Sequence, residues 1–259
     1  MVSRTVHPAA AFRKSARGKR DPTRSIRRMT VFEKELVFLF KRFRDYVIQD
    51  IGKRQERHLE APSKKPLNIN IVGFNQDVDI IARDLLLNPA YNTIQVKIAE
   101  AYRAGGTFAS IALGAPPEQR MDEWKKIAAH IDVTKAAFKG VTDATTNNIK
   151  SIVGNGIIQE DSLSDISRDI VRAVDKIGIT RATMMVRTET MDAVNSGVKD
   201  RYKQAGVDKV EWLTALDDKT CDECEELDGK TFSIDNTPEC PAHPNCRCTW
   251  LAVIDIPED

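Results

Sequence analysis

All five cysteines of this 259-residue chain fall inside the stretch TCDECEELDGKTFSIDNTPECPAHPNCRCTW. Cys221 and Cys224 form C-x-x-C, a spacing that lets two thiolates from one tight turn reach the same ion at about 2.3 Å each. The second half, HPNCRC, supplies His243, Cys246 and Cys248. Because structural zinc takes four soft or borderline ligands in tetrahedral geometry, the pattern predicts a zinc-ribbon-like or knuckle-like site.

The sequence leaves the fourth ligand open. Cys246 and Cys248 are two residues apart, so an extended backbone would point both the same way, whereas a tight turn could aim only one at the metal. Cys240 is a further candidate, ranked last because Pro238 and Pro241 flank it and restrict how its loop can fold back.

Disulfides, unrelated thiols and a catalytic metal fit the cysteine cluster less well. Disulfides would need an oxidising compartment, and no secretory signal is apparent. Unrelated thiols would scatter along the chain rather than gather beside a histidine. A catalytic zinc would keep a water position and a nearby base, as deaminases do with H-x-E ahead of P-C-x-x-C, and no proline precedes Cys221 of the C-x-x-C here. We therefore expect a structural Zn²⁺ and no catalytic residues.

The charge is strongly polarised along the chain although the net charge is only +1. Residues 1–30 hold nine Lys or Arg against one Asp, whereas residues 211–259 hold thirteen Asp or Glu against three Lys or Arg. A basic segment with few apolar residues cannot bury enough surface to order itself, so residues 1–29 are predicted to be a disordered arm.

The basic arm is expected to bind a polyanion, and nucleic acid is the obvious one, although a merely solvated tail is the alternative. The candidate nucleic-acid-binding residues are Arg13, Lys14, Arg17, Lys19, Arg20, Arg24, Arg27 and Arg28.

Between the arm and the cysteines most apolar residues recur at helical intervals. Residues 61–75, which contain the alternating LNINIVGF, are expected to form a connector with one short strand, and further short alternating segments follow after Gly206. The predicted fold is therefore α+β, a predominantly helical body with a small C-terminal β-hairpin domain tied by the Cys/His zinc site. The predicted ranges are the arm (1–29), an N-terminal helical region (30–115), the helical body (116–206) and a zinc-ribbon-like C-terminal domain (207–259).

Several helix boundaries are predicted from capping and breaking residues. A capping box at Thr30 starts a helix that ends near Gly52, and Ser162 or Ser164 starts another. Glycines and one proline are expected to end the helices, at Asn88-Pro89, Gly105-Gly106, Gly154-Asn155-Gly156, Gly178 and Gly206. No membrane-spanning run is expected.

The C-terminal residues also carry a family likeness. The segment VRTETMDAVNSGVKDRYKQAGVDKVEWLTALDDKTCDECEELDGK, continued by PAHPNCRCTWLAVI, resembles the C-terminal domain of phage head morphogenesis proteins, the Mu protein F-like minor head proteins. The matching residues are Arg187, Thr188, Glu189, Tyr202, Gly206, Trp212, Asp217, Thr220, Cys221, Cys224, Leu227, Asp228, Gly229, His243, Pro244, Cys246, Arg247 and Cys248. The likeness covers roughly residues 145–254.

The resemblance implies a minor structural protein (minor capsid protein) of a tailed-phage head. It implies association with the portal protein and with packaged double-stranded DNA, the major capsid protein being a further candidate partner. The expected location is the interior of the virion head near the portal vertex, after assembly in the host cytoplasm. No enzymatic activity follows from the resemblance.

Two alternatives come from other functional classes. A zinc-dependent nuclease or hydrolase would need an open coordination position and a base, whereas Cys-rich ligation closes the site. A zinc-finger DNA-binding protein would need basic residues on or beside the finger, and this segment is acidic.

Overall fold

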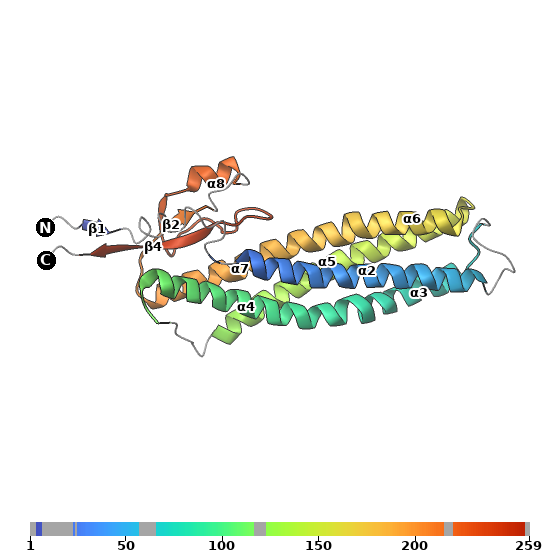
Figure 1. Cartoon of the computed structure of the whole chain (residues 1–259), viewed down its shortest axis with the longest axis horizontal. Helices are drawn as coiled ribbons and strands as arrows, with labels where there is room; N and C mark the ends of the chain where they lie inside the picture. Colours follow the sequence, from blue (N-terminus) through green and yellow to red (C-terminus); the bar gives the residue numbers. More distant parts are fainter. Residues whose placement is uncertain are drawn as a thin grey trace. The chain divides into compact units, whose positions relative to one another are not determined.

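The computed structural model describes residues 4–6, 23, 25–56, 66–116, 123–214 and 220–256. It is mostly helical, with a small antiparallel sheet that is formed largely by the C-terminal part of the chain (Figure 1). The elements in chain order are β1 (Arg4–Val6), α2 (Ser25–Glu56), α3 (Ile71–Ala82), η1 (Arg83–Leu87), α4 (Asn88–Leu113), α5 (Glu123–Ile158), α6 (Leu163–Ala173), η2 (Val174–Ile179), α7 (Thr180–Gln204), β2 (Lys209–Leu213), α8 (Asp222–Leu227), β3 (Thr231–Ser233) and β4 (Thr249–Ile256). The predicted α+β class, mostly helical with a small sheet in the C-terminal part of the chain, is confirmed.

The chain divides into two compact units. Residues 32–94 and 133–185 form one of them, which we call the helical unit. Residues 1–31, 95–132 and 186–259 form the other, which we call the mixed unit because the strands described above belong to it. Each unit draws residues from more than one of the ranges predicted from sequence.

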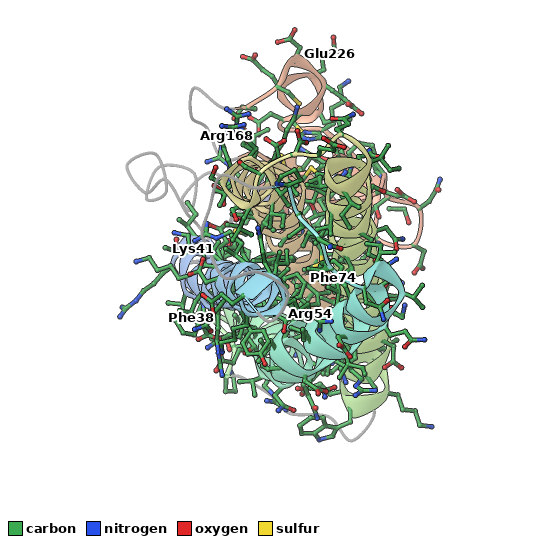
Figure 2. The ribbon with its side chains drawn as sticks, turned by 90° about the vertical axis from the view of Figure 1, so that its right-hand side faces the viewer. Phe38, Lys41, Arg54, Phe74, Arg168 and Glu226 are labelled. Atoms are coloured by element: carbon green, nitrogen blue, oxygen red, sulfur yellow. The ribbon has the colours of Figure 1, made fainter. Side chains whose placement is uncertain are left out.

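The helical unit is a bundle held by buried apolar side chains and a few polar links. Phe40 of α2 meets Phe138 of α5 edge-to-face, with ring centroids 5.8 Å apart. Arg54 of α2 pairs with Asp77 of α3 at 2.5 Å and lies over the Phe74 ring at 5.8 Å (Figure 2). The bundle thus joins α2 to both α3 and α5 through specific contacts as well as through burial.

In the mixed unit, α4 and α7 cross so closely that their backbones touch. A Cβ atom on Gly105 would lie 1.9 Å from the Val194 carbonyl oxygen, and one on Gly197 would lie 2.0 Å from the Tyr102 carbonyl oxygen. Only glycine allows this approach, because any Cβ would overlap the facing backbone. The crossing places one face of α7 beside the C-terminal loops.

The sheet of the mixed unit has strand order β1-β4-β2-β3, and every pairing is antiparallel. In the β2–β4 register Trp212 lies opposite Trp250, and the two indole rings meet edge-to-face at 5.0 Å. The Tyr202 hydroxyl of α7 donates to the Trp250 carbonyl at 3.4 Å. These large buried side chains form the core on which the C-terminal loops rest.

Several predicted helix ends are wrong, and the glycines among them share one physical reason. α4 continues through Gly105-Gly106, α5 continues through Gly154 and Gly156, and Gly178 lies inside the continuous run from α6 to α7. Three of these glycines instead allow another residue to pack directly against the helix, where a Cβ would overlap it. Besides Gly105, a Cβ on Gly156 would lie 2.5 Å from the Ile166 side chain, and one on Gly178 would lie 2.7 Å from the Phe40 ring.

Asn88-Pro89 also fails to end its helix. The five-residue π-helical segment η1 directly precedes it, and the Asn88 amide donates to the Arg83 carbonyl. Proline removes a backbone donor and crowds the preceding turn, and a π-helical turn accommodates both effects without breaking the helix. Gly206, in contrast, follows α7 with φ +71°, as predicted for a helix C-cap.

The N-terminal boundary also differs from the prediction. α2 begins at Ser25 rather than Thr30, and the Ser25 hydroxyl contacts Met191 Sδ at 3.3 Å within the mixed unit. Inside the range predicted as a disordered arm, residues 4–6 form β1 on the edge of β4. The rest of the arm before Thr23 lies outside the described residues.

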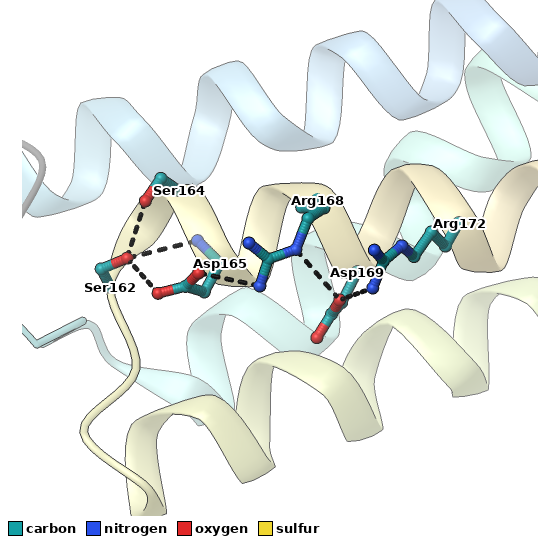
Figure 3. A network of polar contacts seen from close by, with 6 residues as sticks. All are labelled: Ser162, Ser164, Asp165, Arg168, Asp169 and Arg172. Carbon is teal, nitrogen blue, oxygen red and sulfur yellow. Dashed lines mark hydrogen bonds and ion pairs between the residues drawn. The ribbon is translucent and has the colours of Figure 1, made fainter.

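The start of α6 is a polar cap that settles the choice between Ser162 and Ser164. Ser162 is the N-cap: its hydroxyl accepts from the Asp165 amide at 3.3 Å and lies 2.6 Å from the Asp165 carboxylate (Figure 3). Arg168 continues the chain of contacts at 2.8 Å from Asp165. Such a cap satisfies amide groups that would otherwise lack partners.

Candidate metal centre

The C-x-x-C half of the predicted site begins a short helix. Cys221 is the N-cap of α8, and its sulfur accepts from the Cys224 backbone amide at 3.5 Å. This bond favours the thiolate, and it is the main reason why the pKa of Cys221 is lowered. Cys224 lies one turn later and is buried. The helical turn therefore presents both sulfurs on one side.

The histidine half is a tight turn from His243 to Cys246. The Cys246 amide donates to the His243 carbonyl at 3.1 Å, and Asn245 between them has φ +65°. His243 Nδ1 lies 3.0 Å from the Pro244 carbonyl oxygen, so Nδ1 carries the proton and donates it there. In the neutral imidazole Nε2 then keeps a lone pair, as a metal-binding imidazole requires.

The two halves meet around a common point. His243 Nε2 lies 3.1 Å from Cys221 Sγ and 3.3 Å from Cys224 Sγ, and Cys224 Sγ lies 3.8 Å from Cys246 Sγ. Ligand atoms around a tetrahedral zinc ion are about 3.5–3.8 Å apart, given bond lengths of about 2.3 Å to sulfur and about 2.0 Å to nitrogen. The distance between the Cys224 and Cys246 sulfurs matches this geometry, and the two distances to His243 Nε2 are about 0.2–0.4 Å short of it, so the donor set fits zinc in chemistry and nearly fits it in spacing.

The structure thus brings together all five residues predicted as ligands. They form two overlapping groups, Cys221/Cys224/His243 and Cys224/Cys246/Cys248, and the ligand atoms within each group lie within 4.8 Å of one another. Cys240 belongs to neither group. Cys246 and Cys248 are both buried at the site. Their solvent exposure therefore does not show which of the two is the fourth ligand.

The ligand residues line a small pocket with a volume of about 20 Å³, which is room for one ion. Its other lining residues are Thr220, Asn245 and Arg247. Within the described part of the chain, this lining contains no carboxylate, and its single imidazole is the candidate ligand His243. The pocket therefore offers donor atoms for an ion but no separate side chain with the usual properties of a general base.

Burial and mutual hydrogen bonds shift the thiol pKa values in opposite directions. Burial raises the pKa of Cys224 to about 12, whereas hydrogen bonds from Cys240 and Cys248 lower the pKa of Cys246. The pKa of Cys248 is raised, chiefly because its thiol donates to Cys246. A bound divalent cation would favour the thiolate form of its ligands and overcome the effect of burial on Cys224.

Helix α7 holds the loop that carries the second half of the site, a role that the sequence did not reveal for most of its residues. Thr188 accepts from the Asn245 amide at 3.3 Å, and Asn195 Nδ2 donates to the Cys248 carbonyl at 3.0 Å. Further along α7, Lys199 bonds Thr237 at 2.7 Å and Lys203 pairs with Asp235 at 2.6 Å. Thr188, Asn195, Lys199 and Lys203 follow one another at intervals of seven, four and four residues, which places them on a single face of the helix. That periodicity is the sequence signal that could have identified Asn195, Lys199 and Lys203 as residues of one contact surface.

The Leu-Asp-Gly segment after α8 joins the site to the sheet. Asp228 Oδ1 accepts from the Thr214 amide at 3.0 Å, and the Gly229 amide, at φ +81°, donates to the Trp212 carbonyl at 2.9 Å. The strand that follows this turn, β3, pairs with β2. Asp228-Gly229 therefore ends α8 and leads into β3.

The predicted nucleic-acid-binding residues are placed only in part. Arg27 is exposed and Arg28 is half-buried on the first turns of α2. Arg13, Lys14, Arg17, Lys19, Arg20 and Arg24 lie outside the described residues. Within the described ranges, no helix is both long and apolar enough to cross a bilayer.

Comparison with known proteins places the cysteine region in a family. The model of the family described as Phage Mu protein F like protein matches residues 147–251, which confirms for this region the resemblance expected from sequence. A protein of Haemophilus influenzae (strain ATCC 51907 / DSM 11121 / KW20 / Rd), described only as "Uncharacterized protein", is 25% identical over 132 residues. That match covers 49% of this chain and 28% of the relative. No solved structure matches.

The matched family is described as similar to a phage Mu protein, and the match covers 105 of the 259 residues. The matched residues include the whole candidate metal centre and the face of α7 that holds it. The region recognised by family resemblance is therefore also the region in which the structure gathers the ligands.

Proposed function

We propose that this chain is a minor structural protein of a tailed-phage head, associated with the portal protein and with packaged DNA during head morphogenesis. The observation that carries the proposal is the family match over residues 147–251. In this role the protein is not an enzyme. It acts inside the head near the portal vertex, after assembly in the host cytoplasm, with the portal as first partner and the major capsid protein as second candidate.

The proposal includes a structural Zn²⁺ ion held by Cys221, Cys224, His243 and Cys246. The 3.8 Å spacing between Cys224 and Cys246 sulfurs matches an edge of a zinc tetrahedron. Cys248 would then lie beside the coordinating atoms as a thiol donor to Cys246. When bound, the ion supplies a crosslink between α8 and the 243–248 turn.

The surroundings of the site support a protein-facing role rather than a DNA-facing one. α8 carries four exposed carboxylates, on Asp222, Glu223, Glu225 and Glu226. Such a surface repels phosphate, so a zinc-finger that reads DNA is disfavoured, and DNA contact is assigned to the basic arm. A zinc-dependent nuclease or hydrolase, the other alternative, lacks support from the pocket lining, which offers no carboxylate among the described residues.

The direct test is the composition of assembled particles. Heads purified from cells that produce the phage should contain this chain at low copy relative to the major capsid protein, as measured by quantitative peptide mass spectrometry. Full-length protein co-expressed with the portal protein should co-sediment with it. A chain that is abundant in lysate but absent from purified heads, and that does not bind the portal, contradicts the proposal.

A further inference from the structure

Asn195 lies in the middle of α7 and is 1% exposed, directly behind the loop that carries His243 and Cys246. Its Nδ2 atom donates to the Cys248 carbonyl at 3.0 Å and to Cys240 Sγ at 3.1 Å. Cys240 Sγ also contacts the Cys248 carbonyl at 3.2 Å. A single amide group thus ties together two points that are eight residues apart and lie on either side of His243 and Cys246 in the sequence.

A purely apolar contact would not need an asparagine here. A buried amide is favourable only when its groups are paired, and Asn195 Oδ1 has no hydrogen-bond partner in the described part of the chain. The buried Oδ1 atom therefore destabilises the fold, whereas the Nδ2 group donates hydrogen bonds to the loop. An apolar side chain of the same size could fill the volume without that cost, but it could not hold the two ends of the loop.

We propose that Asn195 is a positioning residue of the metal centre, holding Cys240 and the Cys248 carbonyl so that the intervening turn presents His243 and Cys246 to the ion. Metal ligands are commonly oriented by such hydrogen bonds from residues that do not touch the metal. Cys240 is assigned the same supporting role, because it lies outside both groups of ligand atoms. This inference rests on the proposed metal centre.

The other contacts of α7 with the loop supply a matched control. Lys203 lies on the same helix face as Asn195 and holds the loop at Asp235, at 2.6 Å, outside the ligand turn. Its side chain and its partner are exposed. A change at Lys203 therefore tests loop attachment in general, whereas a change at Asn195 tests the ligand turn.

The experiment uses the full chain and compares wild type with Asn195→Leu, Asn195→Asp and Lys203→Met. Each is loaded with Co²⁺ to record the thiolate charge-transfer and d–d absorption bands, and with Zn²⁺ to measure affinity by chelator competition. The melting temperature of each metal-free protein is measured in parallel. Asn195→Asp is nearly isosteric and lacks the amide donors, so it serves where Asn195→Leu fails to fold.

We expect both Asn195 variants to bind one metal ion about 10- to 100-fold more weakly than wild type, with altered cobalt bands, while Lys203→Met stays within about twofold. Wild-type affinity and spectra in a folded Asn195 variant overturn the proposal and reduce Asn195 to a packing residue. A lower melting temperature of the metal-free protein with unchanged affinity overturns it as well. If wild type itself binds neither Co²⁺ nor Zn²⁺, the proposed metal centre fails, which is a different result from failure of the positioning role.

Discussion

His243 Nε2 lies 3.1 Å from Cys221 Sγ, although 22 residues separate the two in sequence. The contact joins the first turn of α8 to the turn that precedes β4. Because His243 Nδ1 bonds the Pro244 carbonyl, the nitrogen that faces the sulfur is the one free to coordinate. This relationship is the basis of the metal-centre proposal and of the first prediction.

Replacing one ligand of the centre should unfold the C-terminal loops, whereas replacing Cys240 should not. Cys221→Ser or Cys224→Ser should remove the ion and lower the free energy of unfolding of the mixed unit by several kcal/mol, because metal binding contributes directly to folding. Cys240→Ser should keep the ion and change stability by about 1 kcal/mol or less, since serine preserves the hydrogen bonds. Zinc content and thermal unfolding measure both, and loss of metal from the Cys240 variant would reverse the ligand ranking.

The glycines at the α4–α7 crossing should not tolerate alanine. Gly105→Ala or Gly197→Ala would place a Cβ about 2 Å from a facing carbonyl oxygen, and the backbones would have to separate. We expect a loss of about 3 kcal/mol or more in unfolding free energy. Gly140→Ala is the control, since nothing lies within 4 Å of its Cβ position in α5, and it should stabilise by about 0.5–1 kcal/mol. Similar denaturation midpoints for the three variants would refute the close crossing.

The cap at Ser162 should set part of the pH dependence of the helical unit. The hydroxyl of Ser162, followed by Arg168, lowers the pKa of Asp165. A carboxyl with a lowered folded-state pKa stabilises the fold above its unfolded pKa of about 3.9, and that contribution is lost as pH falls through the folded value. Ser162→Ala should therefore raise the pKa of Asp165 and make the unfolding free energy depend less steeply on pH in the acid range. It should also lower the unfolding free energy at pH 7 by about 1 kcal/mol, because the helix cap is removed.

Melting temperatures between pH 2 and 7, with the Asp165 titration followed by NMR, measure this prediction. Ser164→Ala is the control, because Ser164 contacts the Ser162 hydroxyl at 2.8 Å but caps no amide. It should change stability by less than about 0.5 kcal/mol. An Asp165 pKa that is unchanged by Ser162→Ala would show that Arg168 alone sets it.

The basic arm should supply most of the DNA affinity without sequence preference. A simple truncation at Thr30 would remove the first turn of α2 and the Ser25–Met191 contact, so neutralisation is the better design. Five substitutions to glutamine leave β1 and α2 intact, at Arg13, Lys14, Arg17, Lys19 and Arg20. The slope of log affinity against log salt on duplex DNA should fall by about 0.9 for each phosphate that the arm no longer neutralises.

Binding of two unrelated duplexes across a salt series measures the arm's contribution. The matched control neutralises three exposed cations of α2 in the helical unit, Lys34, Lys41 and Arg42. Figure 2 labels Lys41 and the exposed Phe38 of the same helix. The slope of this control should equal that of wild type. An unchanged slope in the arm variant, together with a reduced slope in the α2 variant, would move the DNA contact from the arm to α2.

The gathering of the Cys/His cluster could be predicted from sequence because its members come from two short motifs whose spacing is set by local turns. Cys221 and Cys224 share the first turn of α8, and His243 and Cys246 share a tight turn, so each half is determined locally. The support from Asn195 could not be predicted, since it depends on α7 crossing α4 and then facing a loop 45 residues away. Spacing along a helix indicates a shared face but not what that face meets.

The helix boundaries show a similar limit. A glycine that ends a helix and a glycine that admits a neighbour have the same local signal, and only tertiary packing distinguishes them. Gly206 takes a positive φ and follows the end of α7, whereas Gly178 packs against Phe40 inside a continuous helical run. The strand β1 was missed for a related reason, because its partner β4 lies at the other end of the chain.

Native mass spectrometry of the full-length protein, which records the chain together with any bound metal ion, tests directly whether the metal centre exists. We predict one zinc ion per chain, held with the thiols of the site reduced. Acidification or a strong chelator should release the ion, with loss of C-terminal folding. A folded chain that carries no metal, with the cysteines joined as disulfides in peptide mapping, would contradict the metal centre.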